Sequence, residues 1–318
     1  MEMIYLCEKQ NAIRNVYCDE KRVYTKADVL NAPEAFKSTE YVFSTWGMPA
    51  FTEEEIKAYL PELKAVFYAA GSVQKFARPF LNCGVRVFSA WAANAVPVAE
   101  YTVAQIILAN KGFFATMAYT DRKAAKKEAQ NFPGNYGVKI GIIGAGMIGK
   151  LVIQRLGSYN LEVLVFDPFL PDEKARELGV KKVSLETLFQ ECQVVSNHLA
   201  NNEQTRGMLG GVLFEKMRPH ATFLNTGRGA QVVEADLIRA LTERPDLTAI
   251  LDVTFPEPPE EGSALYTLPN CILTPHIAGS SGNEVRRMGA YMEAEYQNLI
   301  QNKPCKYEVT LEMLETMA

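Results

Sequence analysis

The sequence predicts an α/β protein whose central part is a doubly wound parallel sheet, and three observations within residues 139–167 support this. A short apolar run at 140–143 leads into the glycine-rich turn GAGMIG at 144–149. The next segment has apolar residues three and four apart, which is typical of a helix. A second apolar run at 161–166 then stops at Asp167. Strand, turn, helix and strand in this order form one βαβ unit.

The three glycines of this turn have different mechanical tasks. Gly144 allows a tight turn, Gly146 lets the backbone approach a pyrophosphate, and Gly149 lets helix and strand pack closely. The anion would lie at the helix N-terminus, where free N–H groups and the positive end of the dipole point. Asp167 is placed to accept hydrogen bonds from ribose hydroxyls and to repel a 2'-phosphate. The unit therefore predicts a dinucleotide site that favours NAD over NADP.

Composition places the chain among ordinary globular proteins and gives no sign of a nucleic-acid partner. A length of 318 residues favours two domains, and 48% hydrophobic with 22% charged residues supplies enough apolar material for both cores. The net charge is -4 and no block of basic residues occurs, so the electrostatic footprint of nucleic-acid binding is missing. The KAAKKEAQ run at 123–130 is interpreted as the solvated face of a helix.

No metal site, disulfide framework or membrane segment is expected. The six cysteines lie far apart without C-x-x-C spacing. The N-terminus, MEMIYLCEKQ, has no basic region leading into an apolar one, and no apolar run is expected to approach the length of a membrane span. A cytoplasmic location follows as the expectation.

Before the glycine turn, the chain alternates between short buried strands and helices. Strands are predicted at 4–7, 41–44, 65–69 and 85–89, and a helix at 52–60 with Thr52 as its N-cap. This pattern indicates a small parallel α/β domain without a second glycine fingerprint.

A long helical segment follows, with Pro97 in its first turn and its end near Ala129. It is apolar on much of its surface. Burial under a neighbouring domain and a dimer interface explain this surface equally well.

After Asp167 the alternation continues to the end of the chain. Helices are predicted at 184–191, 211–217 and 234–242, and strands at 194–199, 222–225, 249–253 and 272–274. A last helix, 283–302, is expected to cross back and pack on the first domain.

The best candidates for catalytic residues follow the ends of three predicted strands. Of the three histidines, His198 ends a strand and His220 lies in a polar turn, where a solvated role is expected. His276 differs because it follows a strand and precedes a loop of small residues. Arg228 lies between glycines in NTGRG, and Glu257 lies between prolines in FPEP. In doubly wound sheets, ligands bind at the carboxyl ends of strands, which makes the joint occurrence of these three residues informative.

The motifs GAGMIG, NTGRG, LDVTFPEP and LTPHIAGS, in this order, resemble those of the D-isomer-specific 2-hydroxyacid dehydrogenases. The resemblance covers nearly the whole chain. It implies an NAD-binding Rossmann domain, residues 97–278, inserted in a flavodoxin-like substrate domain formed by 1–96 and 279–318. It also implies a homodimer built around the long helix, and interconversion of a small 2-keto acid and the D-2-hydroxy acid.

The same resemblance assigns roles to the three charged residues. Arg228 would hold the substrate carboxylate and polarise the carbonyl with its two-pronged guanidinium. His276 would donate the proton in reduction and accept it in oxidation. Glu257 would hydrogen-bond to the imidazole and favour its charged form.

Further contacts are implied for the substrate and the cofactor. The loop Gly71, Ser72, Val73 aligns with the family's substrate-carboxylate loop, and its N–H groups could bind an anion; an ordinary strand-to-helix turn is the alternative. Cofactor contacts, besides the three glycines and Asp167, fall on Met147, Ile148, Ala200, Thr205, Thr226 and Asp252.

Two other functions compete with the reductase. One is a regulator that senses NAD(H) without turnover, against which the intact Arg228, Glu257 and His276 argue. The other is a phosphoglycerate or hydroxypyruvate specialist, for which Lys75 and Arg78 near the substrate loop would be the cations.

Overall fold

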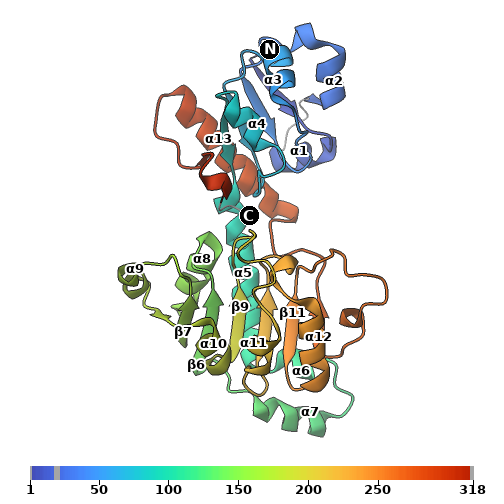
Figure 1. Ribbon diagram of the computed structural model, residues 1–318, viewed down its shortest axis with the longest axis vertical. Helices are drawn as coiled ribbons and strands as arrows, with labels where there is room; N and C mark the ends of the chain where they lie inside the picture. The colour runs from blue at the N-terminus through green and yellow to red at the C-terminus, as the bar shows by residue number, and fades with distance from the viewer. Residues whose placement is uncertain (1, 18–21, 316–318) are drawn as a thin grey trace. The chain divides into compact units, whose positions relative to one another are not determined.

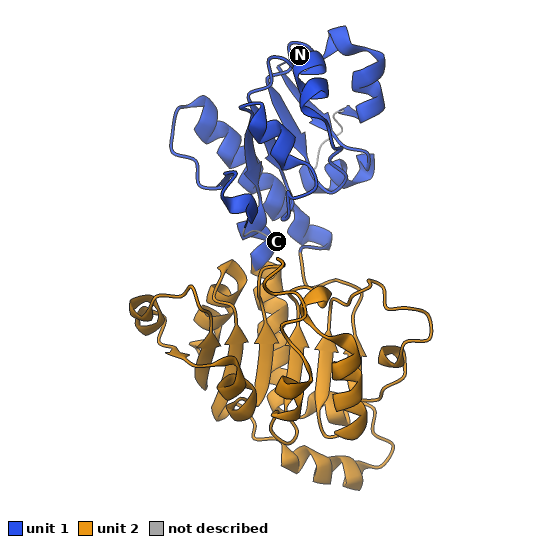
Figure 2. Ribbon diagram, viewed as in Figure 1, with its two compact units in different colours: residues 1–95, 280–318 blue, residues 96–279 orange. Residues whose placement is uncertain are grey.

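The computed structural model describes residues 2–17 and 22–315, and the chain divides into two compact units (Figure 2). Unit 1 contains residues 1–95 and 280–318, and unit 2 contains residues 96–279. These bounds lie one residue from those predicted for the two domains. Each unit has its own sheet and its own core, and each is described separately.

Unit 2 is built on a parallel sheet of seven strands in the order β12-β11-β10-β9-β6-β7-β8. The strands are β6 Tyr136–Ile143, β7 Asn160–Phe166, β8 Lys181–Lys182, β9 Val194–Asn197, β10 Thr222–Asn225, β11 Thr248–Leu251 and β12 Cys271–Leu273. The first strand, β6, lies between β7 and β9, so the winding reverses there. This is the strand order of a Rossmann sheet with one more strand at its end.

Helices bury both faces of this sheet (Figure 1). They are α5 Trp91–Asn110, α8 Met147–Leu156, α9 Asp172–Glu177, α10 Leu185–Glu191, α11 Gly211–Glu215 and α12 Glu234–Glu243. Two short helices between α5 and β6, α6 Phe113–Thr116 and α7 Arg122–Glu128, contain no buried residue. One face packs on α8 and on α5, for example Ile142 with Val152. The other packs on α10, α11 and α12, with Phe223 and Phe214 in its centre. A strand buried on both faces needs a continuous apolar run, which is why these strands were recognisable in the sequence.

The long helix differs from its prediction at both ends. Helix α5, Trp91–Asn110, begins before Pro97, so the proline lies inside the helix rather than in its first turn. The helix also stops well before Ala129, because Gly112 takes a left-handed conformation with φ +69° and separates α5 from α6. A side chain at Gly112 would collide with the Phe132 ring, so the chain turns where no other residue fits.

The expectation that no apolar segment approaches the length of a membrane span is wrong for the same helix. With 20 residues, α5 is long and apolar enough to span a membrane by length and composition. However, 56% of its apolar window is buried in the protein. Ala99, Val103 and Ile106 pack in the core beside β6. A core helix of this length satisfies the same criterion as a spanning one.

Unit 1 has a six-stranded sheet in the order β13-β5-β4-β3-β1-β2. The strands are β1 Met3–Leu6, β2 Val23–Tyr24, β3 Tyr41–Ser44, β4 Ala65–Tyr68, β5 Arg86–Ser89 and β13 Glu308–Val309. The first five are parallel in the order typical of flavodoxin-like folds. Strand β13 pairs antiparallel with β5, and Arg86 Nε donates to Glu308 Oε1 at 2.7 Å across that pair.

Helices again cover both faces. They are α1 Gln10–Tyr17, α2 Lys26–Asn31, α3 Glu53–Tyr59, α4 Ala77–Asn82 and α13 Val285–Ile300. Thr52 caps α3 in a capping box with Glu55, as its sequence predicts. Helix α13 packs on unit 1, where Met288 and Met292 share a core with α1, so the predicted crossing back is confirmed. The predicted fold class, a Rossmann sheet inserted in a flavodoxin-like α/β domain, is confirmed as a whole.

Candidate functional site

The glycine turn after β6 has the geometry of a dinucleotide loop. Gly144 has φ +89°, and a Cβ there would lie 2.9 Å from the His198 carbonyl oxygen. A Cβ on Gly149 would overlap the Gly144 carbonyl oxygen, so helix α8 packs directly on the turn. By contrast, a Cβ on Gly146 would meet no atom within 4 Å. The space in front of Gly146 is therefore open, as the approach of a pyrophosphate requires.

Helix α8 begins at Met147, with Gly146 as its N-cap. The N–H groups of Met147 and Ile148, in the first turn, have no carbonyl partner inside the helix and can bind an anion. Asp167, at the end of β7, lies against the same turn because its carboxylate accepts hydrogen bonds from the N–H groups of Ala145 at 2.7 Å and Phe169 at 2.8 Å. The residues present thus fit a bound dinucleotide.

The loop after β9 holds the next group of predicted cofactor residues. The Thr205 hydroxyl donates to the Ala200 carbonyl at 2.7 Å, which closes a short turn. His198 is buried between Ser196 Oγ, 2.9 Å from its Nε2, and Thr226 Oγ1, 3.4 Å from its Nδ1. Burial lowers the pKa of His198 to about 3, so its imidazole is neutral at ordinary pH.

Arg228 follows β10 and is mostly enclosed by its surroundings. Its Nη1 donates to the Gly227 carbonyl at 2.7 Å. Burial lowers the pKa of the Arg228 guanidinium, and the nearby Glu257 carboxylate opposes this effect. A Cβ on Gly229 would overlap the backbone of Thr254, so the Arg228 loop packs tightly against the segment that leads to Glu257.

Glu257 and His276 form a direct pair. His276 Nδ1 lies 2.7 Å from Glu257 Oε1, and the two side chains are 49% and 42% exposed. His276 takes a left-handed backbone conformation with φ +55°, which is uncommon for a residue with a side chain and recurs at functional sites. Unit 2 therefore brings Arg228, Glu257 and His276 together.

Asp252 supports the loop that carries His276. Its Oδ1 accepts from Thr274 Oγ1 at 2.6 Å and from the Ile277 N–H at 2.9 Å, and its Oδ2 accepts from the Ala278 N–H at 2.9 Å. The Tyr101 hydroxyl lies 3.0 Å from Thr274 Oγ1 and extends this chain of hydrogen bonds to α5. The nicotinamide contact predicted for Asp252 stays a prediction, whereas its bonds to the His276 loop are part of the structure.

In unit 1, the predicted substrate loop follows β4. The Ser89 hydroxyl donates to the Gly71 carbonyl at 2.6 Å and fixes the start of the loop. Within residues 2–17 and 22–315, the N–H groups of Ser72 and Val73 donate to no acceptor, which leaves them available for an anion. Gln74, the next residue of the loop, donates through Nε2 to the Leu314 carbonyl at 2.6 Å.

His220 does not match its prediction as a solvated loop residue. Its backbone N–H donates to Asp246 Oδ2 at 3.1 Å, its carbonyl accepts from Gln193 Nε2 at 2.6 Å, and its side chain is only 24% exposed. The ring packs edge-on against Phe132. The polar residues around it in the sequence concealed this packing partner, which lies in a distant segment.

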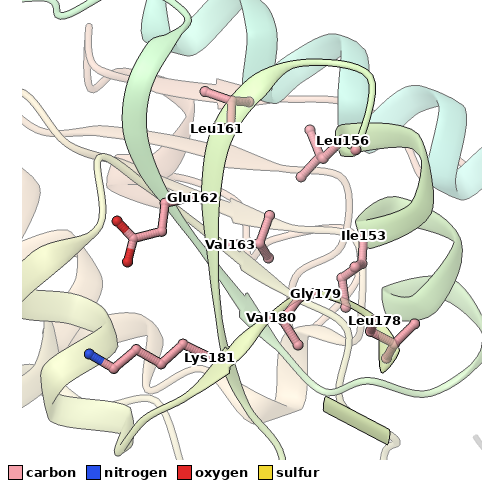
Figure 3. A pocket seen from close by; sticks show the side chains of 10 residues that line it. Ile153, Leu156, Leu161, Glu162, Val163, Leu178, Gly179, Val180 and Lys181 are labelled. Carbon is pink, nitrogen blue, oxygen red and sulfur yellow. The ribbon is translucent and has the colours of Figure 1, made fainter. Parts of the chain in front are cut away.

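A cavity of about 500 Å³ in unit 2 lies away from these residues (Figure 3). It lies between the end of α8 and the first residues of β7 and β8, opposite the sheet edge that carries the glycine turn. Its wall includes Ile153, Leu156 and Val163, with Glu162 and Lys181 on the other side. Among the described residues, no group of three or more His, Cys, Asp or Glu side chains could hold a metal ion.

Sequence reasoning missed two residues beside the site, Asn197 and Gln231. Both are fully buried and hydrogen-bonded to each other. The sequence contained a signal for buried polar side chains at both positions. Asn197 is a polar residue inside a buried strand, and Gln231 precedes two valines.

Known proteins resemble this chain in sequence and in fold. Residues 103–278 match the sequence model of the family "D-isomer specific 2-hydroxyacid dehydrogenase, NAD binding domain". A D-3-phosphoglycerate dehydrogenase of Archaeoglobus fulgidus is 32% identical over 236 residues, which cover 73% of this chain and 44% of that protein. The chain thus spans a little under half the length of the curated relatives it matches.

Solved structures show the same fold along nearly the whole chain. The NAD complex of a D-isomer specific 2-hydroxyacid dehydrogenase from Lactobacillus delbrueckii ssp. bulgaricus superposes with a TM-score of 0.78 at 18% identity, covering 98% of this chain and 100% of that one. D-2-hydroxyisocaproate dehydrogenase gives a TM-score of 0.77 at 20% identity with the same coverage.

Proposed function

Since the chain belongs to the D-isomer specific 2-hydroxyacid dehydrogenase family, with residues 103–278 as its NAD-binding domain, we propose that it interconverts a small 2-keto acid and the D-2-hydroxy acid. The observation that carries this proposal is the Glu257–His276 pair at 2.7 Å with Arg228 beside it. NAD, when bound, supplies or accepts the hydride.

Arg228 has the task of holding negative charge. The substrate carboxylate is an anion, and the carbonyl oxygen becomes negative as the 2-keto acid is reduced. A guanidinium can donate in parallel to two oxygens, and its mostly buried position strengthens such bonds. In the present structure one of its nitrogens donates to the Gly227 carbonyl. In unit 1, the N–H groups of Ser72 and Val73 donate to no acceptor among the described residues, and we propose that they bind an anion.

His276 has the task of moving the proton. Its Nδ1 faces Glu257, so Nε2 is the atom that would meet the substrate oxygen. Donation from Nε2 completes reduction, and acceptance at Nε2 starts oxidation. The Glu257 carboxylate, 2.7 Å from Nδ1, keeps the ring oriented.

We propose a substrate without a phosphate group, although the relative from Archaeoglobus fulgidus is named a D-3-phosphoglycerate dehydrogenase. Arg78 supports this choice, because its Nη2 is paired with Glu315 Oε1 at 2.8 Å and is not free for a phosphate. Lys75 is exposed and remains the cation that a phosphorylated substrate would use.

The test is to mix purified protein and NADH with a panel of 2-keto acids, including pyruvate, hydroxypyruvate and 3-phosphohydroxypyruvate, and to follow NADH absorbance. Consumption of NADH with an unphosphorylated acid is the expected result. Preference for 3-phosphohydroxypyruvate would overturn the substrate choice. Tight NADH binding without turnover of any acid would instead favour an NAD(H) sensor.

We also propose a homodimer through α5 and α6. Leu108, Phe113 and Met117 are 38%, 44% and 53% exposed, and apolar side chains gathered in this way are typical of interaction surfaces. Light scattering after size exclusion should give twice the mass of the 35.4 kDa chain, and Met117→Asp should shift it toward the single-chain mass. A wild-type protein that elutes as a monomer at micromolar concentration would contradict the proposal.

A further inference from the structure

Three side-chain amides form a buried cluster in unit 2. They belong to Asn197 at the end of β9, Asn225 at the end of β10, and Gln231 in the turn that follows Arg228. All three are 0% exposed. Burying an amide is unfavourable unless its hydrogen-bonding groups find partners, so the partners indicate what the cluster does.

The amides first bind one another and the neighbouring loop. Asn197 Nδ2 donates to Gln231 Oε1 at 2.6 Å and to Asn225 Oδ1 at 3.0 Å. Gln231 Nε2 donates to the carbonyls of Leu199 and Ala200, each at 2.9 Å. Both N–H groups of each of these two donors are therefore used, and the cluster has a single hydrogen-bonding arrangement.

The remaining bonds converge on the backbone of Arg228. Its N–H donates to Gln231 Oε1 at 3.2 Å, and its carbonyl accepts from Asn225 Nδ2 at 3.2 Å. The Gly227 N–H donates to Asn225 Oδ1 at 3.0 Å. The peptide groups on both sides of Arg228 are thus fixed by side chains that are themselves immobile.

Gly227 fits the same arrangement. A Cβ on this residue would lie 2.9 Å from both Asn197 Nδ2 and Gln231 Oε1, closer than real Cβ atoms approach. The Arg228 loop therefore rests directly on the cluster, with no space for a side chain between them. Close packing and hydrogen bonds specify one backbone position for Arg228.

We infer that Asn197 and Gln231 are positioning residues that aim the Arg228 guanidinium at the substrate carboxylate. This inference rests on the proposed function. Apolar side chains would fill the same space without buried polar groups, so the amides contribute a defined geometry rather than packing alone. A small displacement of a group that binds substrate charge weakens binding strongly.

The test compares two variants at saturating NADH, with the Kd of NADH measured in each. Gln231→Met keeps the shape of the side chain and removes every hydrogen bond of the amide. Ile250→Val, a fully buried core change on β11, controls for general loosening of the sheet. Thermal unfolding of each variant measures that loosening.

Gln231→Met should raise the KM of the best 2-keto acid about tenfold, with a smaller change in kcat. A tenfold change corresponds to the loss of about one hydrogen bond that holds Arg228 in position. The KM of Ile250→Val should stay within about twofold of wild type. An unchanged KM in Gln231→Met, or an equal rise in Ile250→Val, overturns the inference. If Gln231→Met does not fold, Asn197→Leu takes its place under the same criteria.

A second readout keeps the inference separate from the proposed function. If the wild-type chain binds NADH but reduces no 2-keto acid, the proposed function fails. Hydrogen–deuterium exchange of the peptide spanning 225–231 then tests whether Gln231 holds the Arg228 loop in position. Faster exchange there in Gln231→Met, and not in Ile250→Val, supports it. Equal protection in both variants overturns it.

Discussion

The loops that carry Arg228 and His276 are fixed by opposite means. Buried amides of Asn225 and Gln231, themselves held by Asn197, bind the backbone of Arg228. A single carboxylate, Asp252, binds the His276 loop through backbone N–H groups. Arg228 itself is mostly enclosed, whereas the His276 side chain is about half exposed.

This difference matches the tasks that the two residues have in the proposed reaction. A group that holds a substrate charge gains strength when water is excluded. A group that gives up and regains a proton each cycle needs access to solvent or to the substrate oxygen. Substitutions at the two loops should therefore affect different kinetic quantities.

His276→Asn should give the largest effect. Asparagine keeps a hydrogen-bonding group but cannot donate a proton as an acid, so kcat for 2-keto acid reduction should fall by about 10²–10⁴-fold. NADH binding, measured by fluorescence, should be unchanged because the glycine turn is not altered. A kcat within tenfold of wild type would mean that another group supplies the proton.

Arg228→Lys should follow, with a loss of about 100-fold in kcat/KM, or about 2.7 kcal/mol. Lysine keeps the charge but cannot donate in parallel to two carboxylate oxygens. Steady-state kinetics at saturating NADH measure the loss. Arg228→Lys should raise KM for the 2-keto acid more than His276→Asn does. Equal effects on kcat and KM in both variants would remove the distinction between the two loops.

Glu257→Gln should have a smaller effect, about tenfold in kcat for 2-keto acid reduction. Glutamine keeps an oxygen that can accept from Nδ1, but without the negative charge it holds the ring less firmly in the orientation that directs Nε2 to the substrate. Steady-state kinetics at saturating NADH measure the loss. A kcat equal to that of wild type would exclude this role for Glu257.

The last effect is on stability rather than on catalysis, and it concerns His198, beside Thr226 in the segment that leads to Arg228. Its pKa of about 3 in the folded state lies below the value of about 6.5 in an unfolded chain. As the pH falls below 6.5, the unfolded chain binds the proton first, and the free energy of unfolding decreases until about pH 3. Between pH 6.5 and 5 the decrease should be about 2 kcal/mol.

Urea titrations at pH 6.5 and pH 5 measure this change, with His198→Asn as the control. Asparagine does not titrate here, so the variant should lose about 2 kcal/mol less than wild type over this range. The carboxylates contribute equally to both proteins and cancel in the difference. The same loss in both proteins would show that His198 is not the group responsible.

Local sequence patterns predicted the strands, the glycine turn and the three charged residues, because a buried parallel strand is apolar throughout and functional groups follow its carboxyl end. Tyr101, Thr274 and the pair Asn197 and Gln231 escaped prediction because their partners lie far away in the sequence. The end of α5 escaped for a similar reason, since Gly112 is required there by the Phe132 ring.

Strand β13, only two residues long, has a practical consequence for handling this protein. It covers the otherwise open side of β5 in unit 1 and is held there by the Arg86–Glu308 pair. Shortening the chain before Glu308 would leave unpaired main-chain groups along β5, which invites self-association of the kind that causes precipitation. An affinity tag or truncation should therefore leave residues 308 and 309 in place.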